Sequence, residues 1–208
     1  MATTTPNYGW TVPTSTDLVK DGATAIETLG DAIDASMNTA LGTKKAGMVL
    51  LNTTSFSAVA SQSINDVFSA TYKNYLIQFN MSGSTTNTDV ALRLRVSGAD
   101  NSTSNYTRSG IFQSSTSITG QRLTGQTSWD GIAEVATGVQ SASQTTIFNP
   151  FATEYTSALQ HNGAVVNGNI TMSLRTYGIN LTTSFTGFSI IAGSGTLTGS
   201  LSVYGFNN

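Results

Sequence analysis

The sequence predicts a mainly β protein, with an extended N-terminal arm and a short coiled-coil helix followed by an antiparallel, jelly-roll-like β-sandwich. Residues 14–46 hold a single helical heptad pattern. Residues 47–208 hold seven short runs of near-alternating apolar and polar residues, separated by turn formers. Charged residues make up only 10% of the chain while Ser and Thr are abundant, which is typical of strands whose outer faces carry hydroxyls.

The composition excludes several classes of protein and site. The formal net charge is -2 and the nine Lys and Arg residues are scattered, so no basic stripe is present for a nucleic acid. The absence of cysteine removes disulfides, thiolate nucleophiles and Cys-based zinc sites. No apolar run approaches the roughly 18 residues of a membrane span, and the first residues carry no export signal. We therefore expect no cofactor, no membrane insertion and synthesis in the cytoplasm.

An aromatic arm bounded by prolines occupies residues 1–13. Tyr8 and Trp10 lie between Pro6 and Pro13, and both prolines favour an extended backbone. So short a segment cannot bury a core of its own. The arm either docks onto another chain or folds back so that Trp10 packs on its own domain, and the sequence leaves both alternatives open.

A narrow helical stripe follows in residues 14–46. Segment 14–17 offers hydroxyl and carboxylate N-caps, so we expect the helix to begin near Ser15 and to end near Leu41-Gly42. Apolar or small residues recur at alternating spacings of three and four, at Val19, Gly22, Ile26, Leu29, Ile33, Ser36 and Ala40. This heptad predicts a coiled-coil stem of two or three chains. A lone amphipathic helix packed on the β-domain is the alternative.

The remaining residues, 47–208, are predicted to form the β-sandwich head domain. The predicted strands are residues 48–52, 75–81, 90–96, 145–149, 169–177, 188–192 and 198–206. In residues 90–96, apolar side chains alternate with Arg93 and Arg95, which indicates one buried face and one solvated face in an antiparallel sheet. Turns are expected at pairs such as Asn162-Gly163. Residues 97–144 carry fewer strand signals and are expected to form long loops or a hairpin.

No pattern in the sequence points to catalysis or to a metal. His161 is the only histidine and lies in a predicted turn, without a second His, a Cys or an acidic pair at ligand spacing. Asp130 and Glu134 are the only acids of the β-region that lie near each other in the sequence, and we expect them in a solvated loop. We therefore predict a non-enzymatic protein. A polysaccharide depolymerase is the enzymatic alternative.

Aromatic residues in the loop-rich stretches are the candidate ligand-binding residues. Tyr106 and Trp129 lie there among amide and hydroxyl side chains. This mixture suits a glycan, because sugar C–H faces stack on aromatic rings while sugar hydroxyls form hydrogen bonds. Packing of the same aromatic side chains in the core is the alternative.

The leader TPNYGWTVPTSTDLVKDGATAIETLGDAIDAS, residues 5–36, resembles the N-terminal segment of bacteriophage virion structural proteins of the tail-fibre or minor-tail-protein type. The shared pattern is a PNYGW-type arm, a PTSTD cap and a DGA-x-AI-x-x-LG-DAID helix. The rest of the chain resembles a phage-fibre β-domain only in general terms, and it lacks the extended repeats of a long fibre.

The resemblance implies a docking N-terminus, a short trimeric helical stem and a β-domain present in three copies. The residues implied in docking to other virion proteins are Pro6, Asn7, Tyr8, Gly9 and Trp10. The residues implied in the stem of a homotrimer are Val19, Ile26, Leu29 and Ile33.

The expected function is that of a short trimeric fibre or spike of the virion, whose β-sandwich heads adsorb to host-surface glycan. A capsid decoration, head fibre or baseplate protein without a receptor role is the main alternative. A free-standing carbohydrate-binding module is another, but it leaves the leader unexplained.

Overall fold

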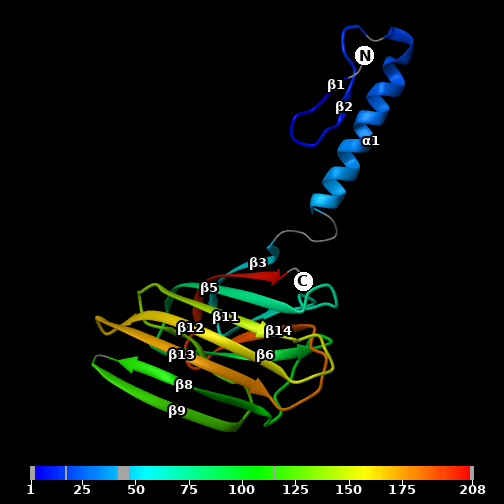
Figure 1. The fold of residues 1–208 in the computed structure, drawn as a ribbon. Helices are drawn as coiled ribbons and strands as arrows, with labels where there is room; N and C mark the ends of the chain where they lie inside the picture. The colour runs from blue at the N-terminus through cyan, green and yellow to red at the C-terminus, as the bar shows by residue number, and fades with distance from the viewer. Residues whose placement is uncertain (1–2, 17, 42–46, 115, 207–208) are drawn as a thin grey trace. The chain divides into compact units, whose positions relative to one another are not determined.

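The computed structural model describes residues 3–16, 18–41, 47–114 and 116–206. The chain forms two compact units, Met1–Ala46 and Gly47–Asn208. Figure 1 shows a small hairpin and one helix in the first unit and antiparallel sheets in the second. The predicted class, mainly β with one short helix and an antiparallel β-sandwich, is confirmed. The jelly-roll-like connectivity and the coiled coil stay predictions.

The N-terminal unit consists of a hairpin and a helix. β1 (Thr3–Thr4) pairs with β2 (Thr11–Val12), and a 3-10 turn, η1 (Val19–Asp21), leads into α1 (Gly22–Leu41). The predicted start near Ser15 is therefore wrong. The hydroxyls of Thr14 and Thr16 hydrogen-bond to each other at 3.0 Å, a local bond that competes with helix capping, and Leu18 before η1 is extended. The predicted stop at Gly42 lies outside the described residues.

The larger sheet of the second unit has eight antiparallel strands, with β3 and β9 at its edges. In spatial order they are β3 (Met48–Val59), β15 (Leu197–Phe206), β5 (Asn74–Ser84), β11 (Ser141–Phe148), β12 (Thr156–Val166), β13 (Asn169–Ile179), β8 (Tyr106–Ser114) and β9 (Ser117–Gln126).

The smaller sheet faces the larger one. In spatial order its strands are β10 (Trp129–Val135), β6 (Thr88–Val96), β14 (Gly187–Ala192) and β4 (Ser61–Ile64), and the short β7 (Ala99–Asp100) pairs with β6. β10 therefore forms one edge and β4 the other. Both edge strands are shorter than the strands of the larger sheet. The smaller sheet therefore covers only part of the inner face of the larger one.

Each of the seven predicted strands is present, and five strands of four or more residues were not predicted. Of the two alternatives for residues 97–144, long loops or a hairpin, the structure shows the hairpin, formed by β8 and β9, and the stretch also holds β10. The turn predicted at Asn162-Gly163 is wrong, since the pair lies inside β12. Neighbouring strands on both sides supply the backbone hydrogen bonds there, and this pairing overrides the local turn preference.

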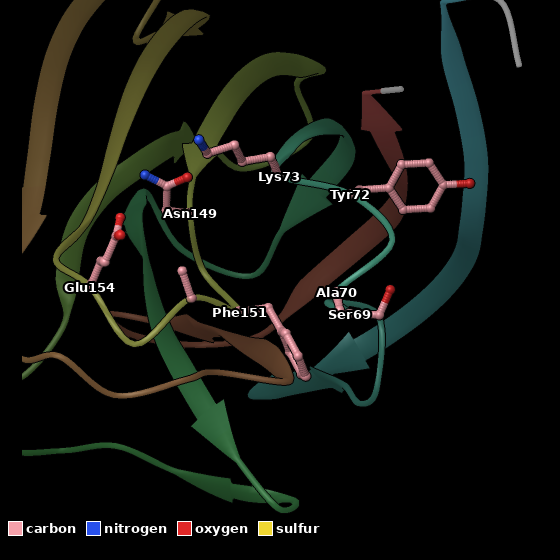
Figure 2. Close-up of a pocket in the computed structure, with 8 residues that line it drawn as sticks. Ser69, Ala70, Tyr72, Lys73, Asn149, Phe151 and Glu154 are labelled. Carbon is pink, nitrogen blue, oxygen red and sulfur yellow. The ribbon is translucent and has the colours of Figure 1, made fainter. Parts of the chain in front are cut away.

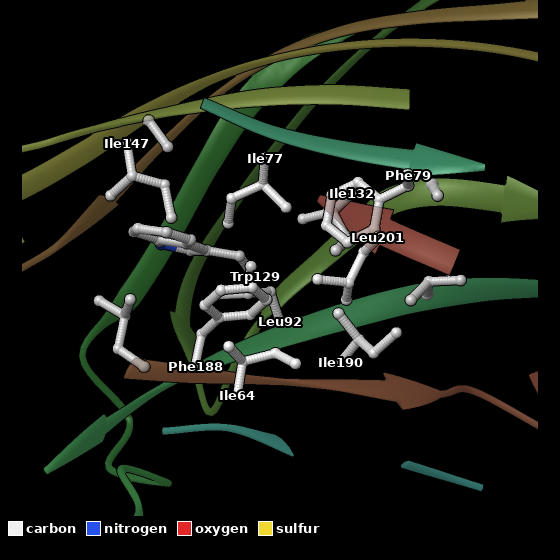
Figure 3. Close-up of a cluster of buried hydrophobic side chains, with 14 of the residues drawn as sticks. Ile64, Ile77, Phe79, Leu92, Trp129, Ile132, Ile147, Phe188, Ile190 and Leu201 are labelled. Carbon is white, nitrogen blue, oxygen red and sulfur yellow. The ribbon is translucent and has the colours of Figure 1, made fainter. Parts of the chain in front are cut away.

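An apolar core lies between the two sheets (Figure 3). Fully buried side chains that meet there include Ile77, Ile147, Leu92, Trp129 and Phe188. They come from β5 and β11 of the larger sheet and from β6, β10 and β14 of the smaller one. Burial of each large apolar side chain contributes roughly 1.5–3 kcal/mol, so this layer is the main source of stability.

β10 carries an irregularity that turns its backbone toward the larger sheet. Its register against β6 shifts between Trp129 and Ala133, and Gly131 within this bulge has a φ of +74°. A Cβ at Gly131 would also overlap the guanidinium group of Arg175. Glycine is required here both for its backbone conformation and for its lack of a side chain.

Three successive carbonyls of β10 accept hydrogen bonds from side chains of the larger sheet. Arg108 Nη1 donates to the Asp130 carbonyl at 2.7 Å, and Arg175 Nη1 donates to the Gly131 carbonyl. The Ile132 carbonyl accepts from Gln160 Nε2 at 3.1 Å. The donors are almost completely buried. Their bonds give partners to three carbonyls of β10 and to one buried polar side chain each on β12, β13 and β8.

Two tyrosine hydroxyls lie inside the same layer. The Tyr106 hydroxyl donates to the Asn101 carbonyl at 2.9 Å and accepts from the Leu94 amide at 3.0 Å. The Tyr177 hydroxyl donates to the Asp130 carbonyl at 3.2 Å. Burial raises the pKa of both phenols, because the ionised form would lose its hydration.

We expect the free energy of unfolding to fall above about pH 10, the ordinary pKa of tyrosine. Below that pH both phenols are neutral in the folded and unfolded chains, so their contribution is fully present. Above it the unfolded chain loses protons that the folded chain retains. The fall approaches about 1.4 kcal/mol per pH unit for each tyrosine. Urea unfolding between about pH 8 and 11.5, followed by tryptophan fluorescence, measures it. An equally steep fall in a Tyr106→Phe, Tyr177→Phe double variant would contradict this explanation.

Candidate functional site

A pocket of about 340 Å³ lies between two loops of the β-sandwich (Figure 2). One loop precedes β5 and contributes Ser69, Tyr72 and Lys73, and the other follows β11 and contributes Asn149, Phe151 and Glu154. The Asn149 amide donates to the Lys73 carbonyl at 2.9 Å, which joins the loops. The pocket is thus built by backbone contacts between segments far apart in the sequence.

One side of the pocket is polar. Figure 2 shows Lys73, Asn149 and Glu154 together on that side. Within the described part of the chain, the buried Oδ1 of Asn149 has no hydrogen-bond donor. This atom is buried away from the pocket surface, so the polar groups offered to a ligand are the exposed Lys73 ammonium and Glu154 carboxylate. Together they suit a ligand that carries several hydroxyls or amides, because hydroxyls can both donate and accept.

The other side of the pocket is less polar and includes Phe151 and Tyr72. Tyr72 packs over Gly205, where a Cβ would meet the ring atoms at 2.5–2.7 Å. The loop of Phe151 is held by bonds from the next loop in space, since Ser184 Oγ donates to the Phe151 carbonyl and the Phe185 amide donates to the Pro150 carbonyl at 2.8 Å. The aromatic side chains are therefore positioned by the fold.

The structure does not place the predicted ligand-binding residues at the surface. Tyr106 and Trp129 are fully buried. Their rings meet edge to face with centroids 6.0 Å apart, and Trp129 Nε1 donates to the Gly178 carbonyl at 2.9 Å. Neither ring offers a face to a sugar. The prediction that they bind ligand is wrong, because both side chains pack in the core between the two sheets.

The expectations for the titratable residues need two corrections. His161 lies in the middle of β12 rather than in a turn, with its side chain exposed on the outer face of the larger sheet. Asp130 and Glu134 lie on β10 rather than in a loop. Arg108 Nη1 donates to Asp130 Oδ2 at 3.1 Å, and Thr171 Oγ1 donates to Glu134 Oε2 at 2.9 Å. These partners give both carboxylates a role in joining the sheets.

Among the described residues, no group of three or more His, Asp or Glu side chains could hold a metal ion. In the same part of the chain, no helix is both long and apolar enough to cross a membrane.

The predicted docking arm contacts the helix of its own unit. Trp10 Nε1 donates to Ser36 Oγ at 2.9 Å, and the rings of Tyr8 and Trp10 stack with centroids 5.1 Å apart. The Tyr8 side chain remains 68% exposed. Of the two alternatives for Trp10, the described unit shows the fold-back, onto the helix of the same unit. Docking by Pro6, Asn7 and Gly9 together with these two rings stays a prediction.

The predicted stem residues differ in exposure. Val19 is 97% exposed and Ile26 is 65% exposed, whereas Leu29 and Ile33 are half-buried within their own unit. Ser36, which binds Trp10, belongs to the same heptad stripe. The arm thus covers one side of the stripe, and the unit leaves apolar side chains uncovered on the other.

No protein-family model matches the sequence, and no curated protein matches it at a significant level. The assignment of function therefore depends on the residues and on their geometry.

Little in the sequence indicates the pocket. Asn149-Pro150 is a pair of turn-forming residues, and the structure has a turn there. Tyr72 and Lys73 precede a predicted strand, so their position at a strand end was a usable signal. The proximity of the two loops was not, because it follows from the pairing of β5 with β11.

We expect Trp129→Phe to lower the free energy of unfolding by about 1–3 kcal/mol while leaving any ligand binding unchanged. The smaller ring leaves a cavity, and the Gly178 carbonyl loses its donor. Chemical denaturation measures the loss of stability, and binding to host cells measures the second expectation. A loss of binding by a fully folded Trp129→Phe protein would contradict the role in the core.

Proposed function

We propose that the chain is a phage virion structural protein, a short trimeric fibre or spike whose β-sandwich heads adsorb to host-surface glycan. The observation that carries the proposal is the uncovered stripe on the N-terminal helix. Ile26 of α1 is a strongly exposed apolar side chain at a heptad position, and Val19 in the preceding η1 turn is exposed as well. Both lie in the segment that resembles the leader of phage fibre proteins. Burial of this stripe against other copies gives it the partner that it lacks.

The short stem explains why several copies would act together. α1 spans 20 residues and contains Gly30, which weakens an isolated helix by about 1 kcal/mol relative to alanine. Its association must be supported by further contacts between copies. In return, three linked heads raise the apparent affinity of a weak site by roughly 10²- to 10⁴-fold without any new contact.

The pocket between the two loops is our candidate for the glycan site. The Lys73 ammonium and the Glu154 carboxylate supply hydrogen-bonding groups, and Phe151 supplies an aromatic surface. Tyr106 and Trp129 are buried and cannot contact a glycan, so the pocket is the candidate site in their place.

We expect Ile26→Asp combined with Ile33→Asp to weaken trimerisation of the full-length protein, because each copy would bring two carboxylates into an apolar seam. Light scattering after size-exclusion chromatography gives the mass. The matched control is Glu27→Gln with Asp31→Asn, which changes exposed positions of the same helix and should leave the mass unaltered. An equal mass for the seam variant and the wild type would refute the coiled-coil stem.

We expect Lys73→Gln combined with Glu154→Gln to weaken adsorption to susceptible host cells or their purified surface glycan by about tenfold or more. Both side chains are exposed, so the fold should be unaffected. Asp66→Asn, an exposed position outside the pocket, is the control. If the wild type binds and the pocket variant binds equally well, the pocket is not the site. If the wild type binds no susceptible host, adsorption is refuted, and the capsid or baseplate alternative takes its place.

A further inference from the structure

Six aliphatic side chains gather on the outer face of the larger sheet, away from the core. We call them the apolar strip: Leu159, Ile170, Met172, Leu174, Ile111 and Ile118. The register brings them together, because Leu174 lies opposite Ile111 across β13 and β8. In the next row, Gln113 of β8 lies between Met172 of β13 and Ile118 of β9.

The apolar strip is unusually exposed for aliphatic residues. Ile170 is 79% exposed, Ile118 is 65% exposed and Leu159 is 48% exposed. Together the six side chains present an apolar patch on the order of 500 Å², at the upper end of what single chains expose to water. A surface rich in Ser, Thr and Asn elsewhere makes the concentration of aliphatic groups here more conspicuous.

The same face is almost free of charge. On the described strands β5, β11, β12, β13, β8 and β9, Arg122 is the only formally charged residue that faces outward. It lies opposite Ser109. Two copies can therefore approach each other here without repulsion between like charges. Depletion of charge with enrichment of apolar side chains is also what distinguishes the centre of a protein–protein contact.

A hollow adjoins the apolar strip. It measures about 400 Å³ and is lined in part by Ala142, His161, Gly163, Met172 and Leu174. It exists because Ala142 and Gly163, which are opposite each other on β11 and β12, are small. The space above Gly163 is open, since a Cβ there would have no atom within 4 Å. An aliphatic side chain of another molecule fits such a hollow.

We propose that the apolar strip and the hollow form a contact between the β-heads of neighbouring copies of this chain. When the apolar strip of one copy meets the adjoining hollow of the next copy, the contact is head-to-tail, and such contacts close into rings when the rotation allows it. With its polar surroundings, the patch approaches the roughly 800 Å² per partner of a stable interface. The inference rests on the proposed trimer and supplies the additional contact that the short stem requires.

A cysteine-free chain allows a direct test. Ile170→Cys is introduced into the full-length protein, once alone and once together with Ile26→Asp and Ile33→Asp. The rate of alkylation by a maleimide is then measured at matched concentrations, with the mass of each sample determined by light scattering. Ala99→Cys, an exposed position on β7 of the smaller sheet, is the matched control.

We expect Cys at position 170 to react about tenfold or more slowly in the oligomer than in the stem-disrupted protein, because a copy covers it. Cys at position 99 should react equally fast in both. A trimer whose position 170 reacts at the unprotected rate overturns this inference and leaves the proposed stem intact. A full-length protein that is monomeric at all concentrations refutes the proposed trimer as well.

A second variant separates contact between copies from binding of a host glycan. Gly163→Leu fills the hollow from a position with open space, so the fold should be retained. We expect it to increase alkylation of Cys at position 170 and to lower the fraction of trimer, with adsorption per trimer unchanged. If Gly163→Leu instead abolishes adsorption and leaves both the mass and the alkylation rate unaltered, the face binds glycan and the inference is wrong.

Discussion

The two sheets of the head depend on a constraint at one edge strand. β10 pairs only with β6, and its bulge directs three successive carbonyls toward the larger sheet. Arg108, Arg175 and Gln160 donate to these carbonyls from strands whose inner faces would otherwise hold buried polar groups without partners. The carbonyls of β10 thus gain donors, and the buried side chains of the larger sheet gain acceptors. Because buried polar groups are costly when unpaired, these bonds fix the position of β10 and, through Trp129, the end of the apolar core beneath it.

This arrangement also decides which surfaces are left for recognition. Trp129 and Tyr106 are occupied in closing the sandwich, and Asp130 is held by Arg108. These aromatic and acidic residues, whose side chains could in principle bind a ligand, therefore have a structural role. Two surfaces of the head are accessible: the pocket between the loops before β5 and after β11, and the outer face of the larger sheet. These two surfaces differ in character, since the first combines charged and aromatic groups and the second is aliphatic and nearly uncharged.

Each of the two units leaves apolar side chains in water. In the N-terminal unit these are Val19 and Ile26, and in the head they are those of the apolar strip. Neither set is covered within its own unit. Association through both would divide the burial between a short helix that is weak alone and a sheet face that is broad, so neither contact has to be strong. Linked weak contacts of this kind are sensitive to the loss of either one, because each raises the effective concentration for the other.

The sequence by itself determined the class of the protein and most of its strands. Alternation in residues such as Val90 to Val96 survives in the structure because a pleated strand with one buried face imposes a period of two on its side chains. The heptad in α1 is equally local, although the helix begins later than its hydroxyl caps indicate.

Only the tertiary structure decided that Trp129 is buried, that Asn162-Gly163 lies in a strand and that the pocket residues lie close together. Asn162-Gly163 has the local preference of a turn, but β11 and β13 pair with it on both sides and extend it. Trp129 is an aromatic residue in a Gly- and Ser-rich stretch, and nothing adjacent in the chain shows that the Gly178 carbonyl and the Tyr106 ring surround it. Such outcomes depend on contacts between residues far apart in the chain, whose free energy exceeds the small local preferences that a sequence displays.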